Sequence, residues 1–470
     1  MFADVYQNRR VLVTGHTGFA GAWLCAWLQS LGARVSGFAR QPAAAHTLGA
    51  QAGLAEHMTS LWGDVRDAQA VHHAVRAAEP EIIFHLALPE DAPDAETVAA
   101  GTVGVWHVLE AAQAAPAVRA VLCVAGDTCY AGAGVPHACR EDAPCADTAY
   151  GAACACTAQL LRVCAARQAG PCMACARTGR LLGGGDWRRG SLLAEAAAAW
   201  AAESPWRMTE AATVRPWQYV LDALSGVLWL GAALFLADAA RAEAADAAGN
   251  AAERGTPDAA EGAELSVAAA AAAQATAFFD APDAARNADA GAGMADAASN
   301  AKADAARAEV SADMADMVAA AQSGTGMAGA ALERYFPWLM PAGLAGTGLH
   351  AAWDALHGTV WNCGPAAAAR QRGAGLAEDI CRHFSGLRVC GEARVPAAGP
   401  QALDSGKALA LLGWRSVLDV EEGVRAAADW YKAWRWSGTG KQGRGLRDVS
   451  LGQIAAYTAA AEYRGAAWLR

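Results

Sequence analysis

The segment "VTGHTGFAGAWL" limits the possible folds more than any other part of the sequence. Gly15, Gly18 and Gly21 stand in a G-x-x-G-x-x-G arrangement, directly after the apolar run "RVLVT" and at the start of a helical pattern. Glycines in this context allow a tight turn and let a pyrophosphate approach backbone N–H groups at a helix N-terminus. A glycine-rich turn can also serve packing alone. The strand–turn–helix setting nevertheless predicts a βαβ unit that holds a dinucleotide.

The rest of the N-terminal half continues this alternation. The segments "RVSGFA", "EIIFHLA" and "AVLCVAG" read as strands, and "AGAWLCAWLQSLG" and "TVGVWHVLEAAQAA" read as helices. Strands separated by helices predict an α/β fold with a doubly wound parallel Rossmann sheet.

Composition divides the chain into three parts. Residues 1–236 are predicted to form the Rossmann domain and the start of a substrate lobe. Residues 237–332 are rich in Ala, Asp and Gly and poor in large apolar residues, as in "ADAARAEAADAAGNAAERG", and are predicted to be a partly helical, low-complexity insertion. Ordered sequence resumes near "RYFPWLMPAGL", so residues 333–470 are predicted to form a smaller C-terminal substrate-binding lobe.

Charge and hydropathy restrict the partners and the compartment. A net charge of −10 over 470 residues argues against nucleic acid and anionic membrane surfaces, which need basic patches. The longest apolar run, "GVLWLGAALFLA", is short for a membrane span. The chain enters a strand pattern almost at once, which leaves no room for a signal peptide. We therefore expect a cytoplasmic protein.

Cysteine and lysine are unevenly distributed. Ten of the thirteen cysteines lie between Cys25 and Cys175, and in such a chain we expect free thiols. The pairs Cys154-x-Cys156 and Cys172-x-x-Cys175 could be zinc ligands, but they lie inside periodic apolar segments, where packing as small apolar residues is favoured. The only four lysines are Lys302, Lys407, Lys432 and Lys441. No lysine of the N-terminal domain can therefore take part in catalysis.

Seven further segments indicate a family. They are "TGHTGFAGAWL", "REDAP", "GGGDW", "RPWQYVLDALSG", "WNCGP", "LGW" and "DWYKAW". In order and spacing this set resembles the CDP-glucose 4,6-dehydratases of the extended short-chain dehydrogenase/reductase (NAD-dependent epimerase/dehydratase) family. The resemblance covers most of residues 8–230 and 358–460.

The resemblance implies a cofactor site for NAD. The residues that it assigns to the cofactor are Gly15, Thr17, Gly18, Phe19, Gly21, Arg40, Asp64, Val65, Leu86 and Ala87. Arg40 stands where NAD-selective proteins often carry a carboxylate. It could receive the 2′-phosphate of NADP or lie in solvent, so NADP remains an alternative.

The resemblance also implies a CDP-glucose-like nucleotide sugar and a homodimer. The residues that it assigns to the substrate are Arg180, Asp186, Trp187, Arg215, Trp217 and Tyr219. Arg215 would face the diphosphate, because guanidinium groups fit phosphate oxygens. The helix after Tyr150 has an apolar face that could serve either a dimer interface or the core.

The catalytic positions are only partly retained. In the family a tyrosine takes the proton of the sugar 4-hydroxyl, a lysine lowers the pKa of that tyrosine, and an acid/base pair eliminates water across C5 and C6. Tyr150 and the general acid Asp127 are present, but Cys154 replaces the lysine of Tyr-x-x-x-Lys. Gly126 and Thr128 replace a hydroxyl residue and a lysine beside Asp127, and Gly101 and Arg180 replace two asparagines.

Three hypotheses follow. A free tyrosine has a pKa of about 10, so at pH 7 only about one in a thousand is ionised. Losing the lysine would then remove roughly 4 kcal/mol of activation. The first hypothesis is a protein that binds NAD and a sugar nucleotide with little or no turnover. The second is an active dehydratase in which an arginine, such as Arg180, replaces the lysine. The third is a non-catalytic interaction protein built on a Rossmann platform.

Overall fold

The computed structural model describes twelve stretches of the chain. They are residues 1–41, 47–90, 92–131, 138–167, 169–188, 190–208, 214–253, 327–339, 348–365, 370–390, 402–437 and 445–470. These residues form two compact units, one made of Met1–Asp238 and Leu356–Arg470 and the other lying within Ala239–Ala355. The candidate site belongs to the first unit.

A seven-stranded parallel sheet forms the centre of the first unit. Its order is β10-β6-β5-β4-β1-β2-β3, and every neighbouring pair is parallel. The strands are β1 (Arg10–Thr14), β2 (Arg34–Ala39), β3 (Thr59–Trp62), β4 (Ile82–His85), β5 (Ala120–Ala125), β6 (Cys172–Thr178) and β10 (Thr359–Cys363). The doubly wound parallel sheet predicted from the alternation of strands and helices is thus confirmed. The seventh strand comes from the C-terminal part of the chain.

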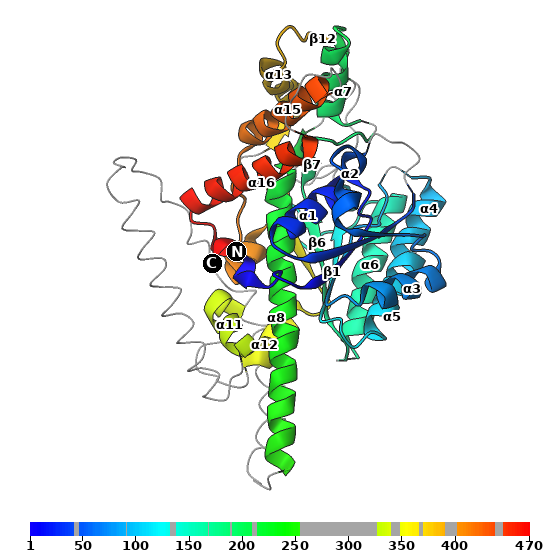
Figure 1. Ribbon diagram of the computed structural model, residues 1–470, viewed down its shortest axis with the longest axis vertical. Helices are drawn as coiled ribbons and strands as arrows, with labels where there is room; N and C mark the ends of the chain where they lie inside the picture. Colours follow the sequence, from blue (N-terminus) through cyan, green and yellow to red (C-terminus); the bar gives the residue numbers. More distant parts are fainter. Residues whose placement is uncertain are drawn as a thin grey trace, which may run out of the picture. The chain divides into compact units, whose positions relative to one another are not determined.

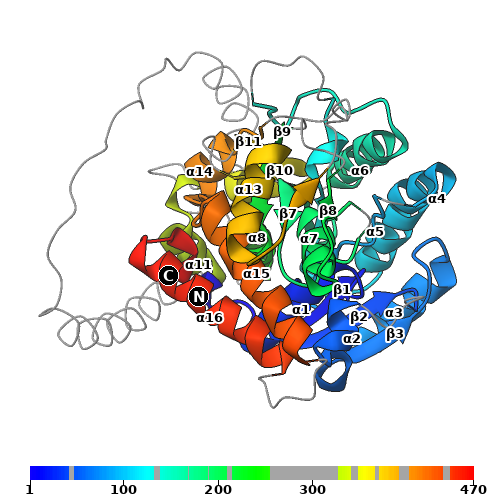
Figure 2. The same ribbon diagram turned by 90° about the horizontal axis from the view of Figure 1, so that it is seen from above.

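Helices cover both faces of this sheet (Figures 1 and 2). On one face, α3 (Ala68–Ala78), α5 (Val105–Gln113) and α6 (Ala149–Ala165) bury their apolar sides in one cluster with alternate strand residues such as Leu12 and Ile83. Side chains of a strand alternate between the two faces, so the residues between them point the other way. There lie α1 (Phe19–Ser30), with Trp23 and Trp27 fully buried, and the first part of α8 (Val220–Glu253).

Shorter elements surround the carboxyl ends of the strands. Around the candidate site are α2 (Leu48–Gln51), α4 (Asp94–Ala99), the π-helical turn η3 (Ala100–Gly104) and η4 (Asp127–Cys129). One small sheet joins β7 (Arg180–Leu182), β9 (Val214–Tyr219) and β11 (Arg370–Arg372), and another joins β8 (Trp206–Arg207) and β12 (Val389–Cys390). The remaining helices are α7 (Leu192–Ala201), α13 (Gly373–His383), α14 (Gly406–Leu412), α15 (Val420–Ser437) and α16 (Leu446–Tyr463).

Helix α8 (Val220–Glu253) contains a long apolar stretch. By length and composition alone, Val220–Asp246 could cross a membrane, but its most apolar stretch is buried inside the protein. Tyr6 donates a hydrogen bond to the carbonyl of Leu228 at 2.5 Å, and Trp229 donates one to the carbonyl of Leu412 at 2.7 Å. These contacts are those of a helix in a protein core.

The two ends of the chain lie side by side in the first unit (Figure 1). The Phe2 ring stacks on Trp468 with centroids 4.9 Å apart, and the N–H of Ala3 donates to the carbonyl of Arg470 at 3.1 Å. Trp27 and Tyr457 complete the cluster through edge contacts. Buried aromatic pairs of this kind stabilise a fold by about 0.5–1.5 kcal/mol each beyond their area.

The second unit contains α11 (Met327–Tyr335) and most of α12 (Gly348–Leu356). The carboxylate of Glu243 accepts a hydrogen bond from the N–H of Ala328 at 3.0 Å. Most of the predicted insertion, residues 254–326, lies outside the described residues. The insertion and the boundaries at 237 and 333 therefore stay predictions.

The cysteines of the two close pairs lie in regular structure. Cys154 and Cys156 are on α6, and Cys172 and Cys175 are buried in β6. All thirteen cysteines are free. In the part of the chain that the structure describes, no group of three or more His, Cys, Asp or Glu side chains is placed to hold a metal ion.

Candidate functional site

The glycine loop between β1 and α1 is shaped by close backbone contacts. Gly15 has a φ of +76°, and a Cβ there would lie 2.8 Å from the backbone of Leu86. A Cβ on Gly21 would lie 2.3 Å from the carbonyl oxygen of Gly15. Only glycine fits both positions, because the opposing atoms are backbone. The loop thus closes tightly, and the N-terminal turn of α1 begins directly after Gly18.

A cavity of about 600 Å³ opens above this loop, at the carboxyl ends of the strands. In doubly wound sheets this is the position where ligands bind. All ten residues predicted to bind the cofactor line the cavity, namely Gly15, Thr17, Gly18, Phe19, Gly21, Arg40, Asp64, Val65, Leu86 and Ala87. Asp127, Gly126, Tyr150 and Arg180 line it as well, so one space joins the glycine loop to the predicted catalytic groups.

Two arginine–carboxylate pairs lie at the end of the cavity near β2 and β3. Arg40 is bound to Glu96 of α4 at 2.7 Å, and Arg66 is bound to Asp64 at 2.6 Å. Arg66 and Glu96 also line the cavity and were not predicted from the sequence. Glu96 offsets the positive charge of Arg40, which favours a cofactor without a 2′-phosphate.

Replacing Glu96 by glutamine is expected to change the cofactor preference. Without its carboxylate partner, the Arg40 guanidinium can bind a 2′-phosphate, and the affinity for NADP should rise about two- to fivefold, the range for a partly exposed ion pair. The affinity for NAD should stay unchanged. Titration calorimetry with both cofactors measures this, with Glu110→Gln on α5 as the control. An equal change for NAD and NADP would contradict the role of Glu96.

Tyr150 sits in the first turn of α6, where Thr148 caps the helix by accepting a hydrogen bond from the N–H of Gly151 at 3.0 Å. The Tyr150 hydroxyl oxygen accepts a hydrogen bond from the N–H of Gly126 at 2.7 Å. Burial raises the pKa of Tyr150 well above its usual value, and the nearby Cys154 and Glu90 raise it further. The hydroxyl is therefore neutral at physiological pH.

The described residues place no lysine beside Tyr150. Cys154, one turn further along α6, is buried. Lys407 is also buried, where its Nζ donates to the carbonyl of Val360 at 2.9 Å and lies 4.0 Å from the centre of the Trp361 ring. Lys432 pairs with Asp429 at 2.8 Å. Lys302 and Lys441 lie outside the described residues.

Gly101 stands where the family resemblance predicts an asparagine, and the structure leaves no room for a side chain there. It lies in η3, which packs against α6. A Cβ on Gly101 would come within 2.3 Å of the Cβ of Ala153. The two helices are thus too close for any larger side chain at this position.

Asp127 begins η4 at the end of β5 and is only 1% exposed. Burial raises its pKa to about 6, although the positive charges of Arg180 and Arg215 act to lower it. Its Oδ2 lies 3.8 Å from Nη1 of Arg215, and neither of these buried atoms has a hydrogen-bond partner among the described groups. A carboxyl group with this pKa is partly protonated near neutral pH and can donate a proton.

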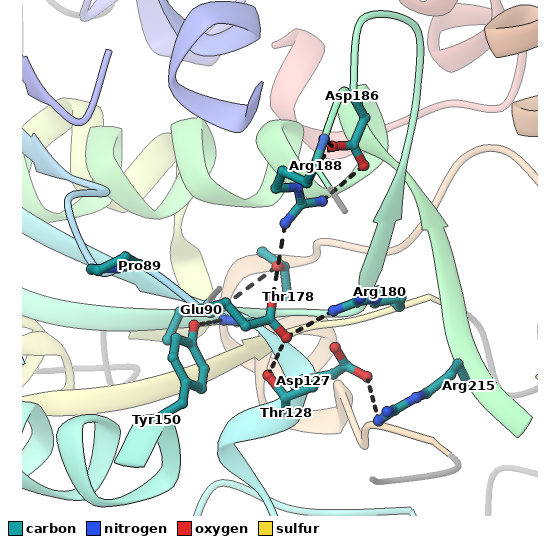
Figure 3. A network of polar contacts seen from close by, with 12 residues as sticks. Pro89, Glu90, Asp127, Thr128, Tyr150, Thr178, Arg180, Asp186, Arg188 and Arg215 are labelled. Carbon is teal, nitrogen blue, oxygen red and sulfur yellow. Dashed lines mark hydrogen bonds and ion pairs between the residues drawn. The ribbon is translucent and has the colours of Figure 1, made fainter. Parts of the chain in front are cut away.

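Glu90 is a further functional candidate that the sequence analysis missed. Its Oε1 accepts hydrogen bonds from Oγ1 of Thr128 at 2.6 Å and from Nη1 of Arg180 at 2.7 Å, and its Oε2 lies 3.7 Å from Nη1 of Arg188 (Figure 3). Its position in the sequence could have indicated this role, because Glu90 follows His85, the last residue of β4, by five residues. At a carboxyl end of a parallel strand such a side chain reaches the ligand crevice.

The predicted substrate residues divide between the cavity and the protein interior. Arg180 lines the cavity, and Arg215 reaches Asp127. Asp186 binds Arg188, at 2.7 Å from its Nε, and with Trp217 lines a small neighbouring pocket. Tyr219 and Trp187 are not brought to the cavity.

Each of these two aromatic residues has another partner. The Tyr219 hydroxyl donates to Gln453 at 3.0 Å from a buried position. The Trp187 ring lies 4.7 Å from that of Trp434, and its N–H donates to Gln51 at 3.0 Å. A role for either in contacting substrate stays a prediction.

Comparisons with known proteins agree on one group. The sequence profile of the NAD-dependent epimerase/dehydratase family matches residues 11–238. CDP-glucose 4,6-dehydratase of Salmonella typhimurium is 30% identical over 250 residues, which cover 49% of this chain and 68% of that protein. A 3-diazoavenalumate denitrifying reductase of a Streptomyces species is 36% identical over 143 residues, which cover 29% of this chain and 43% of that protein.

Solved structures of the same group share the fold. That of dTDP-glucose 4,6-dehydratase from Bacillus anthracis in complex with NAD superposes with a TM-score of 0.55 at 13% identity. The superposition covers 91% of this chain and 96% of that one. At this identity the similarity concerns the fold.

Proposed function

The chain belongs to the NAD-dependent epimerase/dehydratase family, and from this premise we propose that it binds NAD and a CDP-glucose-like nucleotide sugar with little or no 4,6-dehydratase turnover. When bound, NAD supplies a reversible hydride acceptor. The glycine loop would hold its pyrophosphate at the N-terminus of α1, and Asp64 would lie near its adenosine. Arg180, Arg188 and Arg215 would receive the diphosphate of the sugar nucleotide.

The environment of Tyr150 is the observation that carries the proposed loss of turnover. Oxidation at C4 of the sugar requires a base for the 4-hydroxyl proton. Burial raises the pKa of Tyr150 most, and Cys154 and Glu90 raise it further. The hydrogen bond that its oxygen accepts from the Gly126 N–H lowers the pKa, but the sum of these effects leaves the pKa well above its usual value. With a pKa above the usual value of about 10, fewer than about one tyrosine in a thousand is ionised at pH 7.

An active dehydratase with a rearranged site is the second candidate. The pKa of about 6 at Asp127 favours it, because an acid of this strength can protonate the leaving hydroxyl. Arg180, the arginine that this hypothesis needs beside Tyr150, is instead bound to Glu90 at 2.7 Å. The first candidate is therefore the better supported one.

The proposal is tested by binding and turnover measured on the same sample. The full-length protein is freed of dinucleotide, supplied with NAD and CDP-glucose, and examined by calorimetry and by mass spectrometry for a 4-keto-6-deoxy sugar. We expect NAD and CDP-glucose to bind and no product to form. Product formation would support the rearranged site, and binding of neither ligand would leave the interaction-protein hypothesis.

We also propose a homodimer, as the family resemblance implies, and a cytoplasmic location, as expected from the sequence. The apolar face of α6 does not support the dimer, because Cys154, Ala158, Leu161 and Cys164 on this face belong to the core cluster under the sheet. Light scattering coupled to size-exclusion chromatography measures the oligomeric state.

A further inference from the structure

We propose that Glu90 sets the affinity of the cavity for nucleotide sugars, because its carboxylate holds the two arginines that a diphosphate would have to bind. This inference rests on the proposed function and identifies a specificity residue of the same site. In this arrangement the ligand displaces Glu90 from Arg180 and Arg188 and takes over their guanidinium groups.

The geometry places Glu90 where an anionic ligand would lie. Its side chain enters from the loop after β4, and the two arginines come from β7 and from the turn after "GGGDW" (Figure 3). All three residues line the same cavity. A carboxylate and a phosphate present similar oxygen atoms to a guanidinium group, so they compete for it.

The charges around Glu90 show why this competition matters. Three arginines, Arg180, Arg188 and Arg215, face three carboxylates, Glu90, Asp127 and Asp186. The network is therefore neutral as a whole when every group is ionised. A diphosphate adds negative charge to it, and this charge is uncompensated unless a carboxylate is neutralised.

Glu90 is the carboxylate that bridges two arginines. Asp186 is fixed to Arg188 through two hydrogen bonds, of 2.7 and 2.9 Å, and Asp127 is fully enclosed at the end of β5. The Glu90 side chain is 20% exposed and stands on a loop. Moving it requires less rearrangement than moving either of the other two.

Binding should therefore be coupled to proton uptake. In the free protein, the positive charges of Arg180 and Arg188 and the hydrogen bond from Thr128 hold the pKa of Glu90 below its usual value despite its burial. Once a diphosphate displaces it, the carboxylate loses these cations and gains a nearby anion, so its pKa rises. The diphosphate also becomes a neighbour of Asp127. The Tyr150 hydroxyl is neutral both before and after binding and therefore takes up no proton. The affinity of the wild-type protein should consequently increase as the pH falls from 8 to 6.

The experiment is calorimetric titration of the NAD-loaded full chain with CDP-glucose at pH 8 and pH 6. Glu90→Gln retains the size of the side chain and an acceptor for Thr128. It should bind CDP-glucose about tenfold or more tightly than wild type at pH 8, the range for a freed charge-assisted hydrogen bond. It should also show a weaker pH dependence. Glu110→Gln on α5 removes the same charge from a residue outside the cavity and should leave CDP-glucose affinity unchanged.

Four outcomes would overturn the inference. Equal affinity of wild type and Glu90→Gln would show that Glu90 does not compete, and weaker binding by the variant would make Glu90 a direct ligand of the sugar. Stronger binding by both Glu90→Gln and Glu110→Gln would point to the overall charge of the protein. If CDP-glucose binds to neither wild type nor variant while NAD still binds, the proposed substrate class fails as well, which distinguishes the two failures.

Discussion

Replacing Gly126 by serine, Thr128 by lysine and Cys154 by lysine in one protein is expected to raise 4-keto-6-deoxy sugar formation by about 10³-fold or more. The factor is a lower bound, because bringing even an ordinary tyrosine pKa of about 10 to near neutrality corresponds to roughly 4 kcal/mol of activation, and burial holds the pKa of Tyr150 above that ordinary value. A lysine at position 154 stands one helical turn after Tyr150 and supplies the missing positive charge. It acts against both the burial and the thiol that raise the tyrosine pKa.

The structure accommodates these substitutions to different degrees. A Cβ on Gly126 would lie 3.6 Å from the Tyr150 hydroxyl, an ordinary contact from which a serine Oγ can reach the 4-hydroxyl region. Thr128 already contacts Glu90, so a lysine there gains a carboxylate partner. Cys154 is 2% exposed, and a lysine in its place must extend toward the cavity to remain charged. Gly101 is left unchanged, because its Cβ would clash with Ala153.

Product is measured by mass spectrometry with CDP-glucose and NAD, and folding is checked by circular dichroism. The control is Gly126→Ser with Thr128→Lys, which lacks the lysine beside Tyr150 and should remain close to wild type. A folded triple variant that binds NAD and forms no more product than wild type would contradict the hypothesis that only these catalytic groups are missing.

Replacing Gly21 by alanine is expected to weaken NAD binding by at least about 100-fold, or roughly 2.7 kcal/mol. The new Cβ would meet the Gly15 carbonyl oxygen at 2.3 Å and the Cα of His16 at 3.0 Å. These are backbone atoms, so the loop has to open, and the N–H groups that would hold the pyrophosphate move with it. The loss is measured by titration with NAD.

Gly49→Ala is the matched control for this substitution. Gly49 lies in α2, and a Cβ there meets nothing within 4 Å. Its NAD affinity and its thermal midpoint should equal or slightly exceed those of wild type, since alanine favours helix. If Gly21→Ala keeps wild-type NAD affinity, the cavity above the glycine loop is not the cofactor site.

The elements that the sequence predicted are those that a short segment of the chain specifies by itself. The glycine spacing, the apolar strands and the periodic helices each lie within one short segment, and steric limits on the backbone allow few conformations for such patterns. The glycine loop, the parallel sheet and the strands from "RVLVT" to "AVLCVAG" are accordingly found as predicted. The sequence also places Cys154, and not a lysine, one helical turn after Tyr150.

Contacts between distant segments were decided only by the tertiary structure. Glu90 and Arg180 are 90 positions apart, and their 2.7 Å contact depends on how β4 and β7 are placed by the packing of the whole unit. The same packing turns Tyr219 toward Gln453 and brings Gly101 against Ala153. A single sequence specifies which groups can form a site, but their distances and their pKa values arise from the sum of many long-range contacts. The sequence by itself therefore determined the fold and the absence of a lysine four residues after Tyr150, and the tertiary structure decided which carboxylates and arginines meet in the cavity.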